Sequence, residues 1–386
     1  MCAPPSLLLD QCCSLLRRQY RLLATSPPSG VSTGWSGPLG PKYAAGLPHD
    51  CELRDNSQRR SAAQLSAADR AVMQNAGPRE GRRPGAAPAP PASALGWTTT
   101  ILSGAVSGGA VCLDGTAPGY HIQTRDPRRW TVHLQGGGWC TSVQDCFSRS
   151  NGPLGSSKSY AADMDGILAG YDGGAHGILS SDSAVNPDFH NHTKVYVRYC
   201  DGASFAGNLG APVTAPGKRG RSVHFRGWRV LDAVLDSLIE VGLGQAELFI
   251  VNGCSAGGLA VYLHLDYIQS RLPGVRVVGV PEAGFFMDET RWDGNASTGY
   301  TPSYKRVAQM QNVSGGVNGD CVAAAARGEA WRCFMAQYTL PHIRTPYFIV
   351  NSLYDAWQVR KTPSWPTSLA LFTQECMGQL ASFGPT

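Results

Sequence analysis

One short stretch of this sequence constrains the fold more than any other. Residues 247–251 are apolar apart from Glu247, residues 253–257 read Gly-Cys-Ser-Ala-Gly, and residues 259–268 have the composition of a helix. Small residues beside Ser255 permit the strained turn from strand to helix that lifts a serine hydroxyl above the edge of a sheet. The start of the following helix favours negative charge close to that hydroxyl. The stretch therefore predicts a nucleophilic serine, although the five-residue pattern by itself recurs by chance in a chain with 46 glycines.

The chain changes character near residue 96. Residues 1–95 hold 11 Lys and Arg against 6 Asp and Glu, and they are rich in Gly, Pro, Ala and Ser without sustained apolar periodicity. This predicts a low-complexity, disordered N-terminal extension. Residues 96–386 carry 22 charges of each sign, so this region offers no basic face for a nucleic-acid partner.

Residues 96–386 alternate short β-rich runs with helical stretches, which is typical of an α/β domain with a mainly parallel sheet. We expect strands at residues 130–134, 194–199, 247–251, 275–280 and 347–350. Apolar residues at helical spacing predict an amphipathic helix over residues 230–241, ended by Gly242.

Two further stretches fit the chemistry of a serine nucleophile. Three glycines at 136–138 follow the first expected strand, and in an α/β-hydrolase such a loop and the residue after the nucleophile supply the oxyanion hole. Asp355 follows the last expected strand, where a carboxylate can orient a catalytic histidine. The alternatives are an ordinary tight turn for the glycines and a turn or cap for Asp355.

The order of serine then acid fits the α/β-hydrolase series, which next requires a histidine. No histidine follows Asp355 in this sequence. His264 and His342 precede the acid, so the use of either would break the expected order.

Cysteines and glycosylation sequons indicate an oxidising compartment. Eight of the 12 cysteines lie from Cys112 onward, and no C-x-x-C pair is present, so we expect disulfides and no metal. Acceptor sequons stand at Asn191, Asn295 and Asn312. Asp10 interrupts the apolar run near the start, so no clear signal peptide is visible, and no run of about 18 apolar residues predicts a transmembrane segment.

Five motifs, from about residue 97 to 380, resemble those of plant pectin acetylesterases and their animal relative Notum. They are VCLDGT (111–116), HLQGGGWC (133–140), RYCDGASF (198–205), GCSAGG (253–258) and YDAWQ (354–358). The resemblance implies an α/β-hydrolase-like fold, with a mainly parallel central sheet flanked by helices and a nucleophile elbow at Ser255. It implies Ser255 as nucleophile, Asp355 as triad acid, and Gly137, Gly138 and Ala256 as oxyanion donors.

The same resemblance implies structural and substrate-binding roles. It pairs Cys140 with Cys146 and Cys321 with Cys333, although spacing alone does not give the connectivity. We expect substrate to be lined by Trp139, Asp201 and Ser204.

In that family, the catalytic histidine lies further towards the C-terminus than a segment that resembles the residues around Cys376. We therefore expect that its absence here reflects a shortened C-terminus, which makes the activity of the chain as given an open question.

The motifs resemble the plant branch more than Notum. We therefore expect a secreted serine carboxylesterase of the cell wall, monomeric and without a cofactor, which removes O-acetyl groups from a polysaccharide such as pectin through an acyl-serine. One alternative is a Notum-like lipid or protein deacylase with a long apolar pocket. Another is a catalytically dead carbohydrate-binding protein, for which the missing histidine is the evidence.

Overall fold

The computed structural model describes residues 96–160, 177–217, 220–288, 301–352 and 355. The expected N-terminal extension, residues 1–95, lies outside these ranges, and so does Asn295.

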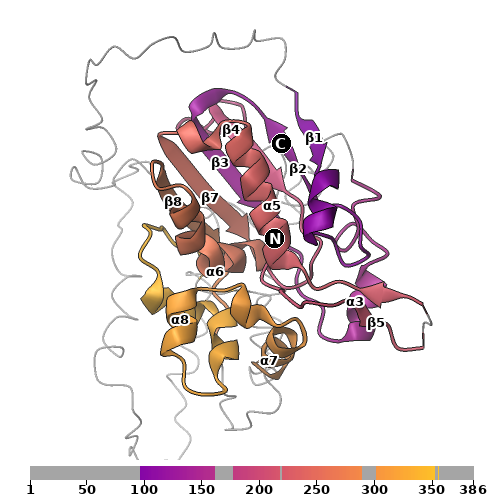
Figure 1. Cartoon of the computed structure of the whole chain (residues 1–386). Coiled ribbons are helices and arrows are strands. Elements are labelled where there is room, and N and C mark those ends of the chain that lie inside the picture. The colour runs from indigo at the N-terminus through magenta and orange to yellow at the C-terminus, as the bar shows by residue number, and fades with distance from the viewer. Residues whose placement is uncertain (1–95, 161–176, 218–219, 289–300, 353–354, 356–386) are drawn as a thin grey trace, which may run out of the picture. The chain divides into compact units, whose positions relative to one another are not determined.

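A six-stranded sheet organises the described residues (Figure 1). In spatial order the strands are β1 (Thr98–Ile101), β2 (Gly119–Gln123), β4 (His192–Val197), β3 (Asp126–Leu134), β7 (Leu248–Cys254) and β8 (Arg276–Glu282). The last four run parallel, whereas β1 and β2 are antiparallel additions at one edge. The predicted mainly parallel sheet is confirmed, and the antiparallel edge is a feature that the sequence patterns did not reveal.

The last expected strand, residues 347–350, lies beside β8. Tyr347 bridges Gly279 and Val350 bridges Glu282, both in parallel sense. These bridges extend the parallel arrangement beyond β8 and bring the chain that leads to Asp355 to the end of the sheet.

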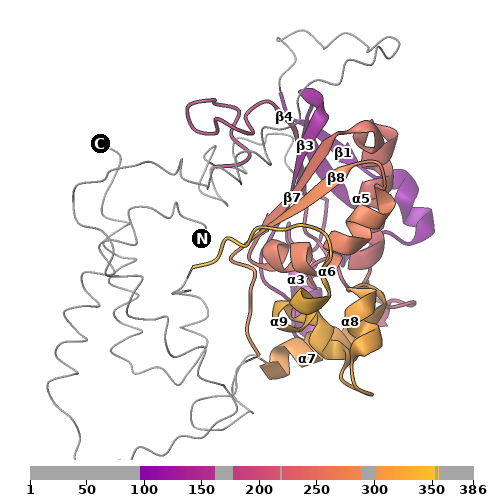
Figure 2. The same cartoon turned by 90° about the vertical axis from the view of Figure 1, so that its left-hand side faces the viewer.

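Two long helices, α5 (Gly227–Glu240) and α6 (Ala256–Arg271), pack with the sheet in one apolar core. Figure 2 shows both helices on the same side of the strands. The stripe of α5 that is buried consists of Val230, Leu231, Val234, Leu235 and Leu238, which are the positions that the helical periodicity selected. After α5, Gly242 adopts a φ of 116°, a left-handed conformation that favours glycine and ends the helix.

The opposite face of the sheet carries buried polar side chains. His133 on β3 shares a hydrogen bond of 2.5 Å between its Nδ1 and the Oδ1 of Asn252 on β7. The His133 ring stacks on Tyr196, with 5.3 Å between ring centroids. Burial, together with the nearby charge of Arg198, lowers the pKa of His121 to about 4. These histidines therefore belong to a buried polar layer.

Short helices form a second apolar cluster against α6. They include α7 (Thr301–Met310) and α9 (Ala336–Thr339), with 3-10 turns η4 (Val313–Gly315), η5 (Ala330–Phe334) and η6 (Leu340–His342). The short helix α8 (Gly319–Ala324) is joined to η5 by the Cys321–Cys333 disulfide. Leu259 and Tyr262 of α6 pack in this cluster with Tyr304, Trp331 and Phe334. Smaller elements elsewhere are α3 (Val143–Arg149), η2 (Ser103–Gly108), η3 (Leu243–Gln245), β5 (Val213–Thr214) and β6 (Ser222–Val223).

Disulfide bonds connect segments of the described structure. Both expected pairs are present, with Cα separations of 5.0 Å for Cys140–Cys146 and 5.9 Å for Cys321–Cys333. A third bond, Cys112–Cys200, joins cysteines 88 positions apart that the sequence did not pair. Cys254 is also disulfide-bonded. Among the described residues, no helix has the length and apolar character needed to cross a bilayer.

Candidate active site

Ser255 occupies the tight turn between β7 and α6. Its φ of 58° and ψ of −122° lie in a region that costs a non-glycine residue about 1–3 kcal/mol. Two backbone hydrogen bonds hold this conformation: the Ser255 N–H donates to Glu282 at 3.0 Å, and its carbonyl accepts from the Leu259 N–H at 2.9 Å. The side chain remains partly exposed. The strand-to-helix turn expected at Ser255 is therefore confirmed.

The glycines around Ser255 permit close contacts between backbones. A Cβ atom on Gly257 would lie 1.9 Å from the carbonyl oxygen of Leu134, the last residue of β3. A Cβ on Gly253 would lie 2.4 Å from the Gly257 carbonyl oxygen. Any side chain at either position would force the start of α6 away from the sheet, so the glycines of the motif are required by packing.

The glycine loop at the end of β3 lies directly against Ser255. A Cβ on Gly136 would approach the Cys254 carbonyl oxygen to 2.2 Å and the Ser255 Cβ to 3.3 Å. Gly137 and Gly138 adopt φ angles of 137° and 68°, which an L-residue with a side chain rarely adopts. The structure therefore brings together two of the elements that the sequence analysis selected, the serine turn and the glycine loop.

Two side chains bind the carbonyl groups of the glycine loop. Arg149, at the end of α3, donates from Nη2 to the Gly137 oxygen at 2.9 Å. The hydroxyl of the buried Tyr199 donates to the Gly138 oxygen at 2.8 Å. Neither contact was expected from the sequence, because Arg149 lies 12 positions from Gly137 and Tyr199 lies 61 positions from Gly138.

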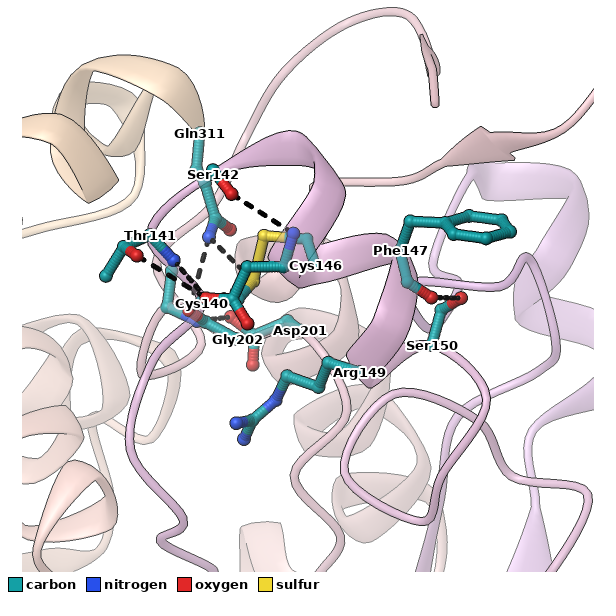
Figure 3. The surroundings of a disulfide bond; sticks show 12 residues. Cys140, Thr141, Ser142, Cys146, Phe147, Arg149, Ser150, Asp201, Gly202 and Gln311 are labelled. Atoms are coloured by element: carbon teal, nitrogen blue, oxygen red, sulfur yellow. Dashed lines mark hydrogen bonds between the residues drawn. A yellow bond between two sulfur atoms is a disulfide. The ribbon is translucent and has the colours of Figure 1, made fainter. Parts of the chain in front are cut away.

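The Cys140–Cys146 disulfide fixes the chain just after the glycine loop (Figure 3). The Cys140 N–H donates to the Gly202 carbonyl at 3.2 Å, and the Gln311 amide donates to the same oxygen at 3.2 Å. Figure 3 shows Arg149 extending from α3 towards the segment of Asp201 and Gly202. The loop is thus tied covalently to α3 and by hydrogen bonds to residues after β4.

The three residues expected to line substrate differ in exposure. Trp139 is partly exposed, whereas the side chains of Asp201 and Ser204 are fully buried and bind protein groups. Asp201 accepts from the Ala203 N–H at 3.1 Å, and burial raises its pKa to about 7. Ser204 contacts Trp139 and Ala256. A substrate contact by any of these residues stays a prediction. In this structure, Asp201 and Ser204 form hydrogen bonds with neighbouring protein groups.

The segment that leads to Asp355 passes the serine turn. Val350 bridges Glu282, whose carbonyl accepts from the Ser255 N–H, and the Val350 carbonyl accepts from Ala283 N–H at 2.8 Å. Asp355 itself is partly buried. Its role as the triad acid stays a prediction.

Seven of the nine histidines are among the described residues, and none of these seven hydrogen-bonds Ser255. His264 is fully buried, and its Nε2 lies 2.8 Å from the Ser204 carbonyl oxygen, to which a neutral ring protonated at Nε2 donates. Burial lowers the His264 pKa to about 4, which keeps the ring neutral near pH 7. His342 ends the short turn η6. Among the described residues, the site therefore contains a serine and a glycine loop, and no histidine that hydrogen-bonds the serine.

Comparison with known proteins gives a consistent result. The profile of the family described as Pectinacetylesterase matches residues 92–379. Pectin acetylesterases 5 and 7 of Arabidopsis thaliana are 39% and 38% identical to this chain, over 65% and 68% of its length. Those alignments cover 56% and 63% of the two relatives, so the chain spans less than two thirds of either.

More distant similarities involve animal proteins. Palmitoleoyl-protein carboxylesterase notum1 of Xenopus laevis is 29% identical over 64% of this chain and 50% of its own length. The solved structure of the Wnt deacylase Notum from Drosophila has a TM-score of 0.61 and 27% identity, covering 74% of this chain and 81% of that one. The fold is therefore the α/β-hydrolase-like fold that the sequence predicted.

Proposed function

Because this chain belongs to the pectinacetylesterase family, we propose that it is a serine carboxylesterase that removes O-acetyl groups from a cell-wall polysaccharide such as pectin. One observation carries the proposal: Ser255 has a left-handed φ in a strand-to-helix turn, and the glycine loop lies against it. Strain at a partly exposed serine is typical of an activated nucleophile. The similarity to plant pectin acetylesterases supports the substrate class.

The proposed reaction has two steps. The Ser255 Oγ attacks the acetyl carbonyl, and backbone N–H groups of Gly137, Gly138 and Ala256 bind the oxyanion. An imidazole base, which none of the seven described histidines supplies, takes the serine proton and passes it to the departing sugar oxygen, and Asp355 is the carboxylate that would orient it. Collapse of the intermediate leaves acetyl-Ser255 and frees the sugar hydroxyl, and water then releases acetate by the reverse sequence of proton transfers.

An aromatic cluster beside the glycine loop supports a short acyl group. Trp139 packs edge-on against Phe286, with 4.9 Å between ring centroids, and against Tyr304 at 4.8 Å. Phe286 and Tyr304 are almost fully buried, so aromatic rings fill the space on that side of Trp139. We propose that the acyl group enters on this side of Trp139, where the packed rings favour an acetyl group over a long acyl chain.

The compartment and domain organisation are parts of the same proposal. We propose an esterase domain over residues 96–386, preceded by a low-complexity extension, in a secreted, monomeric glycoprotein of the cell wall. Three disulfides between described cysteines support an oxidising compartment. The sequon residues Asn191 and Asn312 are exposed, as glycosylation requires.

Acetate release from acetylated pectin tests the function. Since no described histidine bonds Ser255, each assay is run with and without added imidazole as an external base. We expect release that imidazole accelerates and that Ser255→Ala abolishes, and faster hydrolysis of p-nitrophenyl acetate than of the octanoate. Because imidazole alone hydrolyses activated esters, its rate without protein is subtracted. Release above that rate that survives Ser255→Ala contradicts the mechanism, and a preference for octanoate favours a deacylase. Pectin binding without release under either condition favours a binding protein.

A further inference from the structure

Ser204 connects the two segments that supply the proposed oxyanion donors. Its hydroxyl accepts a hydrogen bond from the Trp139 Nε1–H at 2.8 Å and donates one to the Ala256 carbonyl oxygen at 2.7 Å. Trp139 directly follows the glycine loop, and Ala256 directly follows Ser255. A single buried hydroxyl therefore bridges the glycine loop and the start of α6.

The backbone of Ser204 is held as firmly as its side chain. Its N–H donates to the Tyr199 hydroxyl at 3.0 Å, and its carbonyl oxygen lies 2.8 Å from the His264 Nε2. All hydrogen-bonding groups of Ser204 thus have partners. Two of the partners, Trp139 and Tyr199, follow β3 and β4, and the other two belong to α6.

Ser204 and Phe205 also carry backbone strain, with φ angles of 51° and 59°. Left-handed conformations cost non-glycine residues about 1–3 kcal/mol each and persist where the surroundings impose them. Such strain occurs mainly at functional sites. A tight surface turn would use glycine here, so the strain indicates that the Ser204 side chain is needed in this position.

Tyr199 fixes the orientation of one peptide in the glycine loop. Its hydroxyl binds the Gly138 carbonyl oxygen, which belongs to the peptide between Gly138 and Trp139. All peptides of the described residues are trans, so the Trp139 N–H points away from Tyr199. Arg149 binds the Gly137 carbonyl oxygen. Because the peptide between Gly137 and Gly138 is also trans, the Gly138 N–H points away from the guanidinium.

We propose that Ser204 and Tyr199 are positioning residues that hold the glycine loop and the start of α6 in the arrangement needed to bind an oxyanion. Both side chains are fully buried, so they act through the backbone groups that they bind. Oxyanion donors must lie about 2.7–3.1 Å from the developing charge, and a displacement of about 1 Å costs on the order of 10²-fold in rate. This inference rests on the proposed esterase function.

The first measurement reports the geometry without any need for turnover. The protein is labelled with [15N]tryptophan, and the Trp139 signals are assigned with a Trp139→Phe variant. We expect Ser204→Ala to shift the Trp139 indole resonance and to speed its hydrogen exchange. Tyr199→Phe should shift the Trp139 backbone amide, because the Gly138 carbonyl loses its donor.

The second measurement reports catalysis, as the Ser255-dependent part of p-nitrophenyl acetate hydrolysis in imidazole, which is the rate that remains after the Ser255→Ala rate is subtracted. We expect Ser204→Ala and Tyr199→Phe each to lower kcat by on the order of 10- to 100-fold with KM nearly unchanged, because oxyanion binding develops only in the transition state.

Matched controls remove the same groups elsewhere in the interior. Ser150→Ala deletes a buried hydroxyl that binds the Phe147 carbonyl at 2.7 Å, and Tyr120→Phe deletes a buried phenol that binds Ser237 at 2.9 Å. Neither control should alter kcat or the Trp139 signals.

The outcomes separate this inference from the proposed function. Trp139 resonances that stay unmoved, or kcat values equal to those of the controls, overturn the positioning role. If the unaltered protein shows no Ser255-dependent turnover even with imidazole, the proposed function fails. The Trp139 resonances then still decide whether Ser204 and Tyr199 orient the loop.

Discussion

Replacing Gly136 with alanine tests how closely the glycine loop must approach Ser255. The added Cβ would lie 2.2 Å from the Cys254 carbonyl oxygen, whereas real Cβ contacts are essentially never shorter than 3.0 Å. Backbone atoms on one side or the other must therefore move by at least the difference, 0.8 Å. Overpacking of this kind costs about 1–3 kcal/mol of stability, so the protein should still fold.

The same displacement should have a larger effect on catalysis. A shift of about 1 Å in a catalytic group costs on the order of 10²-fold in rate, or about 2.7 kcal/mol of transition-state stabilisation. We expect Gly136→Ala to lower kcat for p-nitrophenyl acetate by that order, measured with imidazole present, and to lower the urea midpoint modestly. Gly274→Ala is the matched control, because its Cβ would meet no atom within 4 Å. Wild-type kcat in folded Gly136→Ala protein would refute the proposed contact between the loop and the nucleophile.

Three further predictions concern stability. Burial lowers the His264 pKa from 6.5 to about 4, so stability falls as pH drops through that window. The free energy of unfolding, measured in urea, should depend on pH less steeply in His264→Gln than in the wild type, by about 1.4 kcal/mol per pH unit between these two values. Equal slopes in the two proteins would argue against a buried neutral ring. Burial raises the Asp201 pKa from 3.8 to about 7, so stability is lost as pH rises through that range. Asp201→Asn should therefore gain stability relative to wild type as pH increases, and a constant difference would contradict this. Removing the Cys112–Cys200 disulfide should lower the free energy of unfolding by about 4–5 kcal/mol, because it closes a long loop. Removing Cys140–Cys146 or Cys321–Cys333, which close short loops, should lower it by about 2–3 kcal/mol. Equal losses for the long and short loops would contradict this ranking.

The sequence predicted those parts of the fold that depend on local patterns. The turn at Ser255 was recognisable because the apolar run, the small residues and the helix are adjacent in the chain. Helix α5 was recognisable because its buried side chains recur at helical spacing. The parallel strands β3, β4, β7 and β8 were found because each contains a short run rich in β-branched and aromatic residues.

Features that depend on distant pairing escaped prediction. Strand β1 consists of three threonines and an isoleucine, which is too short and polar a run to distinguish from a loop. The bond between Cys112 and Cys200 spans 88 positions, and eight candidate cysteines leave many pairings open.

The support of the glycine loop was also hidden from sequence reasoning. Ser204 reaches Ala256 across 52 positions, and Tyr199 reaches Gly138 across 61. The RYCDGASF motif marked this segment as special without saying what it binds. We expected Asp201 and Ser204 to line substrate because they belong to that motif. Both side chains are buried instead, because the residues after β4 pack against α5 and α6.

A trapped acyl-enzyme tests the central claim most directly. The protein is mixed with p-nitrophenyl acetate, quenched in acid within the first turnover, digested, and its peptides are analysed by mass spectrometry. The account predicts one acetyl group on the peptide that contains Ser255, reduced in Gly136→Ala and absent in Ser255→Ala. Ester hydrolysis with acetyl groups only on other residues, or with none on the Ser255 peptide, would contradict it.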